Sequence, residues 1–167
     1  MKVRVLLADD HKIVRDGLKA LLEKESDMEV VGEADGGLQA VRLARELSPT
    51  VIVMDIAMPD LNGIEAAQKI REHDSVVKII ALSMHSDKRF VGGMLRAGAS
   101  GYLLKDCAYG ELANAIRSVM KDQTYLSPGI AHVVVEGYVR NVGSPGQSAA
   151  SALTPREREV LQLLAEG

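Results

Sequence analysis

Acidic side chains follow apolar runs at two separate places in the sequence. Asp9 and Asp10 come directly after Val3–Ala8, and Asp55 comes directly after residues 51–54. Both runs are short and aliphatic, and the second is rich in β-branched residues, so they are predicted to be buried strands. In an open parallel sheet, chemistry collects outside the carboxyl ends of the strands. We therefore expect the three carboxylates at one edge of a sheet.

Three carboxylates close together favour cation binding and phosphoryl chemistry. Their mutual repulsion is relieved by a bound cation. An all-oxygen cluster suits Mg²⁺, which takes about six oxygen ligands and often combines one or two carboxylates with phosphate oxygens. Histidine and cysteine do not occur at zinc-ligand spacing, and His11 is interpreted as a surface residue at the start of a helix. A carboxylate can also attack phosphorus and form an aspartyl phosphate.

Two further polar residues end apolar runs later in the chain. Ser83 follows residues 76–82, and Lys105 follows Gly101–Leu104. A lysine offers a mobile positive charge to a phosphoryl oxygen, and a serine hydroxyl can donate to another. Each residue alone is more often an ordinary group at the end of a strand. Their joint occurrence indicates a phosphoryl-transfer site, which needs little more than alignment and charge stabilisation.

The elements that must position these residues alternate along the chain. Strands are expected at Val3–Ala8, Met28–Ala34, residues 51–54, residues 76–82 and Gly101–Leu104, and helical patterns follow at residues 14–22, 41–47, 64–70, 88–97 and 110–121. This alternation predicts an α/β fold, with a parallel sheet covered on both faces. By analogy with five-stranded doubly wound sheets we expect the order 2-1-3-4-5, with the first and third strands side by side.

The pattern changes after the fifth strand and helix. Ser127 and Pro128 form a helix start, and a helix is predicted over residues 130–139. Residues 141–152 are rich in Gly, Ser, Pro and Ala and are interpreted as a linker. Residues 153–167 begin with a capping box and carry an apolar stripe, which predicts one amphipathic helix. The expected units are residues 1–122, a linker over 123–152 with a helix, and residues 153–167.

Composition excludes several classes of function. The formal net charge is −3, which argues against electrostatic binding of nucleic acid by this stretch. The single cysteine, Cys107, cannot form an internal disulfide and suits a reducing compartment. We expect no secretory leader, and the sequence contains no apolar run of about 20 residues. We therefore expect a cytoplasmic protein with no membrane partner.

In combination, the motifs resemble the receiver domain of two-component response regulators. They are Asp9 with Asp10, the stretch from Asp55 through Met58 and Pro59 to Gly63, Ser83, and the run GYLLK that ends at Lys105. The resemblance covers Met1 to about Lys121 and implies a CheY-like, or flavodoxin-like, fold. The wording GYLLKD and the final LTPREREVLQLLAEG are similar to the NarL/FixJ class, which carries a LuxR-type helix-turn-helix effector.

The resemblance also implies a role for each residue of the predicted site. Asp55 would accept a phosphoryl group from a sensor histidine kinase in a Mg²⁺-dependent reaction. Asp9, Asp10 and Asp55 would hold Mg²⁺ together with the backbone carbonyl of Ala57. Lys105 would pair with the phosphoryl group. No enzymatic activity is expected beyond the protein's own phosphorylation and autodephosphorylation.

Signal output is implied by the same resemblance. Ser83 and Tyr102 would form a hydroxyl–aromatic switch pair, in which Tyr102 turns from an exposed to a buried rotamer on phosphorylation. The face formed by the fourth helix, fifth strand and fifth helix would then support a homodimer, with the first and fifth helices as a competing surface. Residues 153–167 match only the opening helix of the effector. The chain is therefore interpreted as truncated, with DNA binding expected only from the full-length protein.

Two other functions stay open at this point. The chain could be a Mg²⁺-dependent phosphohydrolase with an aspartyl-phosphate intermediate. That alternative is weakened because Ala57 stands two residues after Asp55, where an acid–base residue would be needed. The chain could also be a receiver-like interaction module that never takes a phosphoryl group. The complete set of site residues argues against this second alternative.

Overall fold

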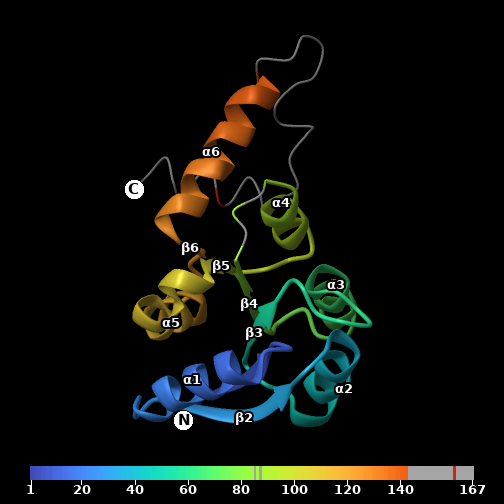
Figure 1. The fold of residues 1–167 in the computed structure, drawn as a ribbon, viewed down its shortest axis with the longest axis vertical. Helices are drawn as coiled ribbons and strands as arrows, with labels where there is room; N and C mark the ends of the chain where they lie inside the picture. Colours follow the sequence, from blue (N-terminus) through green and yellow to red (C-terminus); the bar gives the residue numbers. More distant parts are fainter. Residues whose placement is uncertain (85, 87, 143–159, 161–167) are drawn as a thin grey trace.

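The computed structural model describes residues 1–84, 86, 88–142 and 160 of the 167-residue chain (Figure 1). The strands are β1 (Val3–Ala8), β2 (Met28–Ala34), β3 (Val51–Asp55), β4 (Lys78–Ser83), β5 (Gly101–Leu104) and β6 (Tyr125–Leu126). The helices are α1 (Lys12–Glu23), α2 (Gly37–Leu47), α3 (Gly63–His73), α4 (Lys88–Arg96), α5 (Lys105–Met120) and α6 (Pro128–Val142). Strands and helices therefore alternate along the described residues.

The strands form one sheet in the order β2-β1-β3-β4-β5-β6. Every neighbouring pair is parallel. This order confirms the predicted α/β fold and the predicted arrangement 2-1-3-4-5 of the first five strands. All five residues of β3 are buried, as expected for a central strand of a sheet that is covered on both faces.

Helices cover the two faces of the sheet unequally (Figure 1). The apolar cluster on one face includes Leu18 and Leu22 of α1 and Leu112 and Ile116 of α5. The cluster on the other face draws on α2, α3 and α4, and Ile130 adds α6 to it. Because alternate residues of a strand point to opposite faces, β1 contributes to both clusters. The sheet thus lies between two helical layers, and this packing fixes the positions of its strand ends.

The structure differs from the prediction in details, and β4 begins at Lys78 rather than at residue 76 and includes Ser83. Strand β6, which pairs Tyr125 with Gly101, was not expected, because two residues are too few to show an alternating pattern. Helix α5 begins at Lys105 rather than at residue 110. Helix α6 confirms the helix predicted around residues 130–139 and extends it to Val142, two residues into the predicted linker.

The end of the predicted linker and most of the predicted terminal helix lie outside the described residues. Residues 143–152 of the linker, and 153–159 and 161–167 of the expected effector helix, belong to this group. Val160 is described. It is helical and buried, and it belongs to the apolar cluster on the α2, α3 and α4 face of the sheet.

Candidate functional site

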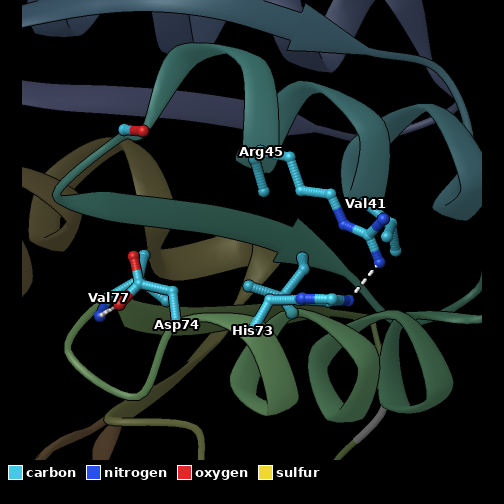
Figure 2. A pocket seen from close by; sticks show the side chains of 8 residues that line it. Val41, Arg45, His73, Asp74 and Val77 are labelled. Atoms are coloured by element: carbon cyan, nitrogen blue, oxygen red, sulfur yellow. Dashed lines mark hydrogen bonds between the residues drawn. The ribbon is translucent and has the colours of Figure 1, made fainter.

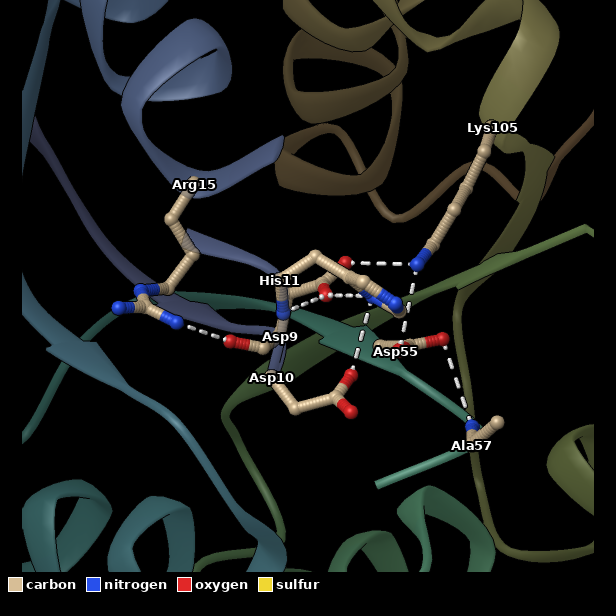
Figure 3. Close-up of polar contacts among 7 residues, drawn as sticks. All are labelled: Asp9, Asp10, His11, Arg15, Asp55, Ala57 and Lys105. Carbon is tan, nitrogen blue, oxygen red and sulfur yellow. Dashed lines mark hydrogen bonds and ion pairs between the residues drawn. The ribbon is translucent and has the colours of Figure 1, made fainter. Parts of the chain in front are cut away.

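The register of the central strands brings the predicted acidic residues together. Strands β1 and β3 pair in parallel so that Ala8 lies beside Met54. The next residues, Asp9 and Asp55, therefore reach the carboxyl-terminal edge of the sheet side by side (Figure 3). Both are almost completely buried, with 2% of each residue exposed. The convergence that was expected from the ends of two apolar runs is found.

Four side chains at this edge are close enough to share a metal ion. Ligand atoms of Asp9, Asp10, His11 and Asp55 all lie within 4.8 Å of one another. The buried Oδ2 atoms of Asp9 and Asp55 lack a well-directed hydrogen bond within the described part of the chain. Buried carboxylate oxygens without such bonds are costly unless a cation is nearby. The donor set is dominated by carboxylate oxygens, which fits a hard divalent cation.

Lys105 is the cation that the protein itself places at the cluster. Its Nζ lies 2.9 Å from Oδ2 of Asp9 and 3.2 Å from Oδ2 of Asp55. The lysine is the first residue of α5, so its stem starts at the end of β5 and crosses the open edge of the sheet (Figure 3). Lys105 was predicted to lie at the same edge of the sheet as the carboxylates, and the structure places it there.

Burial makes the ionised form of Asp55 unfavourable. Desolvation raises the pKa of Asp55 to about 6, the neighbouring charge of Asp9 adds to the rise, and Lys105 opposes it. For Lys105, burial acts to lower the pKa, but the carboxylates of Asp9 and Asp55 outweigh it, and the net effect is a raised pKa. The site therefore combines a carboxyl group whose ionised form is disfavoured with an ammonium group whose charged form is favoured.

The charge of Asp55 is expected to cost stability in the absence of metal. Because the pKa of Asp55 is raised, the folded state favours the protonated carboxyl group. The resulting stabilisation is complete below the unfolded-state pKa and is lost as the pH rises through about 6. We expect Asp55→Asn to raise the free energy of unfolding by about 1–2 kcal/mol at about pH 7 in EDTA, after allowance for solvent screening, and by far less at about pH 4. Urea unfolding at both pH values measures this. Asp16→Asn, which neutralises an exposed carboxylate, is the control, and an equal gain at both pH values would contradict the prediction.

His11 and Arg15 belong to the site although their contacts were not anticipated. His11 is the N-cap residue of α1, as expected for a residue at the start of a helix. Its Nδ1 lies 3.0 Å from Oδ1 of Asp9 and 3.1 Å from Oδ1 of Asp10. Arg15 donates a hydrogen bond to the backbone carbonyl of Asp9 at 2.5 Å. Both residues thus steady the acidic turn after β1.

The loop after β3 packs tightly behind Asp55. The backbone N–H of Ala57 faces Oδ1 of Asp55 at 3.4 Å, and the side chain of Ala57 is exposed. Gly63 donates a backbone hydrogen bond to Ile56 at 2.8 Å. A Cβ atom on Gly63 would lie only 2.3 Å from the carbonyl oxygen of Asp55. Glycine is therefore required where the loop passes the backbone of the predicted phosphoacceptor.

Ser83 and Tyr102 lie on the adjacent strands β4 and β5. Ser83 ends β4 and is buried, and β4 pairs with β5 so that Ala81 lies beside Tyr102. Tyr102 is fully buried and belongs to the apolar cluster on the α2, α3 and α4 face. The prediction of an exposed tyrosine as the starting rotamer is therefore wrong for this structure. The ring is held inward by apolar packing that the sequence spacing did not reveal.

A separate pocket of about 280 Å³ opens at the opposite end of the sheet, between α2 and α3 (Figure 2). Arg45 and His73 are hydrogen-bonded across it, and Asp74 lies at its rim, where it accepts backbone bonds from Val76 and Val77. The pocket lies near the amino-terminal ends of β3 and β4, whereas Asp55 and Ser83 lie at their carboxyl-terminal ends. None of the predicted site residues lines it.

Comparisons with known proteins agree with this geometry. The model of the response regulator receiver domain matches residues 5–117. The transcriptional regulatory protein LiaR of Bacillus subtilis is 44% identical over 99% of this chain and 77% of its own length. The nitrate/nitrite response regulator protein NarL of Escherichia coli is 36% identical over 98% of this chain and 75% of its own length.

A solved structure also matches most of the described fold. It is a two-component response regulator of the LuxR family from Aurantimonas sp. SI85-9A1, with a TM-score of 0.79 and 38% identity. The match covers 83% of this chain and 99% of that one. In the described residues, no helix is both long and apolar enough to cross a bilayer.

Proposed function

Because the chain belongs to the response regulators of two-component systems, we propose that Asp55 accepts a phosphoryl group from a phosphohistidine of a sensor kinase. The observation that carries the proposal is the position of Asp55. Its carboxylate ends the central strand, lies 3.2 Å from the ammonium group of Lys105, and adjoins the carboxylates of Asp9 and Asp10. A carboxylate that could act as nucleophile, a cation, and an oxygen cluster that could hold a metal ion lie close together, and this arrangement supports the proposal.

The proposed transfer is a single displacement at phosphorus. A carboxylate oxygen of Asp55 attacks the phosphorus, the P–N bond to the kinase imidazole breaks, and the imidazole leaves with the bonding electron pair. Lys105 exchanges part of its pairing with Asp55 for a phosphoryl oxygen, which keeps the new negative charge neutralised. Because both partners of Lys105 are buried, its ammonium group is already oriented before transfer.

Mg²⁺ is the metal that this donor set fits best. We propose that Asp9, Asp10 and Asp55 hold it with the backbone carbonyl of Ala57. The ion would supply positive charge to the phosphoryl oxygens. His11 contacts both Asp9 and Asp10, so its imidazole would have to share these oxygens with the ion. A histidine is a poor ligand for Mg²⁺, and we assign it no metal bond.

Ser83 and Tyr102 are the proposed switch. A phosphoryl oxygen would accept a hydrogen bond from the hydroxyl of Ser83, which is buried at the end of β4. Tyr102 already lies inward, so phosphorylation would stabilise this rotamer at the expense of an outward one. The change would reach the face formed by α4, β5 and α5, where a homodimer could form.

The proposed output is transcription, since the relatives are named as transcriptional regulatory proteins. We propose that residues 1–122 form the receiver, that residues 123–152 connect it, and that residues 153–167 begin a LuxR-type DNA-binding domain. DNA would be bound through the complete effector domain rather than through the receiver. The partner that supplies the phosphoryl group would be a sensor histidine kinase.

Incubation with a small phosphodonor tests the proposal directly. We expect acetyl phosphate and Mg²⁺ to add one acid-labile phosphoryl group, seen by intact-mass measurement. A mass that stays unchanged under these conditions would contradict the phosphoacceptor assignment and favour an interaction module that takes no phosphoryl group. Repeated turnover of acetyl phosphate in large excess over the protein would instead favour a phosphohydrolase.

Ala57 is expected to make the phosphorylated state long-lived. Its methyl group lies two residues after Asp55 and cannot orient a water molecule for attack. We expect Ala57→Asn to speed phosphoryl loss by about tenfold, because an amide can position the attacking water. The half-life after removal of the donor measures this. Ala57→Leu, whose side chain branches at Cγ like that of asparagine but has no hydrogen-bonding groups, should not speed the loss, and equal rates in the two variants would contradict the prediction.

A further inference from the structure

Ser127 lies where α6 begins, and its hydroxyl group is buried between other elements. The residue is fully buried. Its hydroxyl donates to a carboxylate oxygen of Glu111 on α5 at 3.0 Å and accepts from the backbone N–H of Leu104 at 3.2 Å. Its own N–H donates to the carbonyl of Tyr102, and its carbonyl accepts from Ile130 in the first turn of α6. One residue therefore joins β5, α5 and α6.

The bond to Leu104 places this junction next to the acidic site. Leu104 is the N-cap residue of α5 and has no polar side chain with which to cap the helix. Lys105 follows it directly and contacts the carboxylates of both Asp9 and Asp55. A single hydrogen bond and a single peptide bond thus separate Ser127 from the lysine that is proposed to bind the phosphoryl group.

Apolar packing holds α6 on the same junction. Ile130 is fully buried and belongs to the same apolar cluster as Tyr102. The Cβ position of Gly129 lies 3.7 Å from a methyl group of Leu104. Farther along α6, Val133 and Val134 pack against the same cluster, and Gly137 lies against Lys88 of α4. The beginning of α6 is therefore fixed to the β5–α5 junction, and the next turns rest on α4 before the helix extends away from the sheet (Figure 1).

Glu111 strengthens the junction from the side of α5. Its carboxylate accepts the hydrogen bond from Ser127. Burial, with the nearby charge of Glu111 as a second cause, raises the pKa of the Tyr125 hydroxyl in β6. Both ends of the short segment from β6 to α6 therefore face the same carboxylate. A movement of the first turns of α5 would therefore displace this segment.

We propose that Ser127 is a positioning residue that couples Lys105 to α6, an inference that rests on the proposed phosphorylation of Asp55. When Lys105 shifts from Asp55 towards a phosphoryl oxygen, the backbone at Leu104 and Lys105 moves with it. The hydrogen bond between Leu104 and Ser127 passes this movement to the first turn of α6. Helix α6 is then the element through which the receiver acts on the residues that follow.

Hydrogen exchange of the whole chain, with and without acetyl phosphate and Mg²⁺, tests this coupling. In the unmodified protein, phosphorylation should change amide exchange in the first turns of α6 by more than about threefold. Ser127→Ala should still gain one phosphoryl group but lose this response in α6. Without phosphodonor, the Leu104 amide of Ser127→Ala should exchange about fivefold faster, the size expected for one net hydrogen bond.

Three further variants separate coupling from loss of fold. Glu111→Ala removes the second partner of Ser127 and should weaken the α6 response in the same direction, whereas Glu111→Gln retains an acceptor oxygen and should preserve it. Ser118→Ala removes a hydroxyl group elsewhere on α5 and should leave the response unchanged. The Glu111 pair provides the test if Ser127→Ala does not fold.

The possible failures point to different conclusions. Absence of a mass gain in the unmodified protein would overturn the proposed phosphoacceptor and this inference with it. A mass gain without any response in α6 would overturn the coupling alone. A response in α6 that persists in Ser127→Ala and Glu111→Ala would also overturn the coupling alone.

Discussion

Asp55→Asn is expected to abolish the addition of a phosphoryl group by acetyl phosphate and Mg²⁺. An amide has no anionic oxygen with which to attack phosphorus, while its size and shape match those of the carboxylate. The neighbouring carboxylate of Asp9 is paired with Lys105 and His11, so it is a poor substitute nucleophile. Intact mass after incubation measures the result, and the acid lability of any adduct identifies an acyl phosphate.

Asp60→Asn is a matched control in the same loop. Asp60 is exposed, and its backbone φ of 63° lies in the left-handed region, which asparagine tolerates. The Asp60 variant should therefore fold and gain one phosphoryl group at the unmodified rate. Asp55→Asn should also be at least as stable as the unmodified protein at neutral pH, so loss of fold cannot explain loss of labelling. Persistent labelling of Asp55→Asn would place the acceptor elsewhere.

The placement of the acidic site could be predicted because each acidic residue directly ends an apolar run. Asp9 and Asp55 needed only the strand ends and an order that sets β1 beside β3. The order itself came from analogy, since no local pattern says which strands are neighbours. The position of Lys105 was predicted by the same reasoning, because it directly follows β5, which lies two strands from β3 in the sheet. Strand ends in a parallel sheet thus carry positional information that a single sequence reveals.

The start of α5 could not be predicted because its stabilising partner is distant in sequence. Leu104 occupies the N-cap position but is not one of the polar residue types that signal a helix start, and the buried positions of the helix begin only at Ala108. The acceptor for the N–H of Leu104 is the hydroxyl of Ser127, 23 residues later. Strand β6 was missed for a similar reason, since two residues form a strand only because β5 offers a free edge.

Side-chain contacts between different helices and strands could not be predicted from the sequence either. Arg15 was not identified from the sequence, yet it donates a hydrogen bond to the carbonyl of Asp9. Tyr102 could be assigned to a strand, but its inward rotamer depends on packing against helices from another part of the chain. Periodicity places a residue on a face of its own element. It does not say which partner that face will meet.

Removal of Mg²⁺ is expected to slow phosphorylation by at least about a hundredfold, because a bound metal supplies several kcal/mol of charge stabilisation to the transferred group. Excess EDTA should produce this loss in the unmodified protein. Asp10→Ala should weaken Mg²⁺ binding and slow phosphorylation together. Asp10 suits this test because it is partly exposed and makes no contact with Lys105 that would be lost with it. Calorimetric titration with Mg²⁺ and labelling rates from intact mass measure the two effects.

Asp106→Ala is the control for the metal prediction. Asp106 is an exposed carboxylate next to Lys105 in sequence, but it lies outside the four-residue cluster. Its removal changes the net charge by the same amount as Asp10→Ala and should leave Mg²⁺ binding within a factor of about two, because exposed charges are screened. If EDTA leaves the labelling rate unchanged, or if both variants lose Mg²⁺ binding equally, the cluster formed by Asp9, Asp10 and Asp55 does not act through a bound metal. Charge neutralisation of the phosphoryl group would then rest on Lys105, the cation that contacts Asp55 in this structure, and Lys105→Met should slow phosphorylation by about a hundredfold instead.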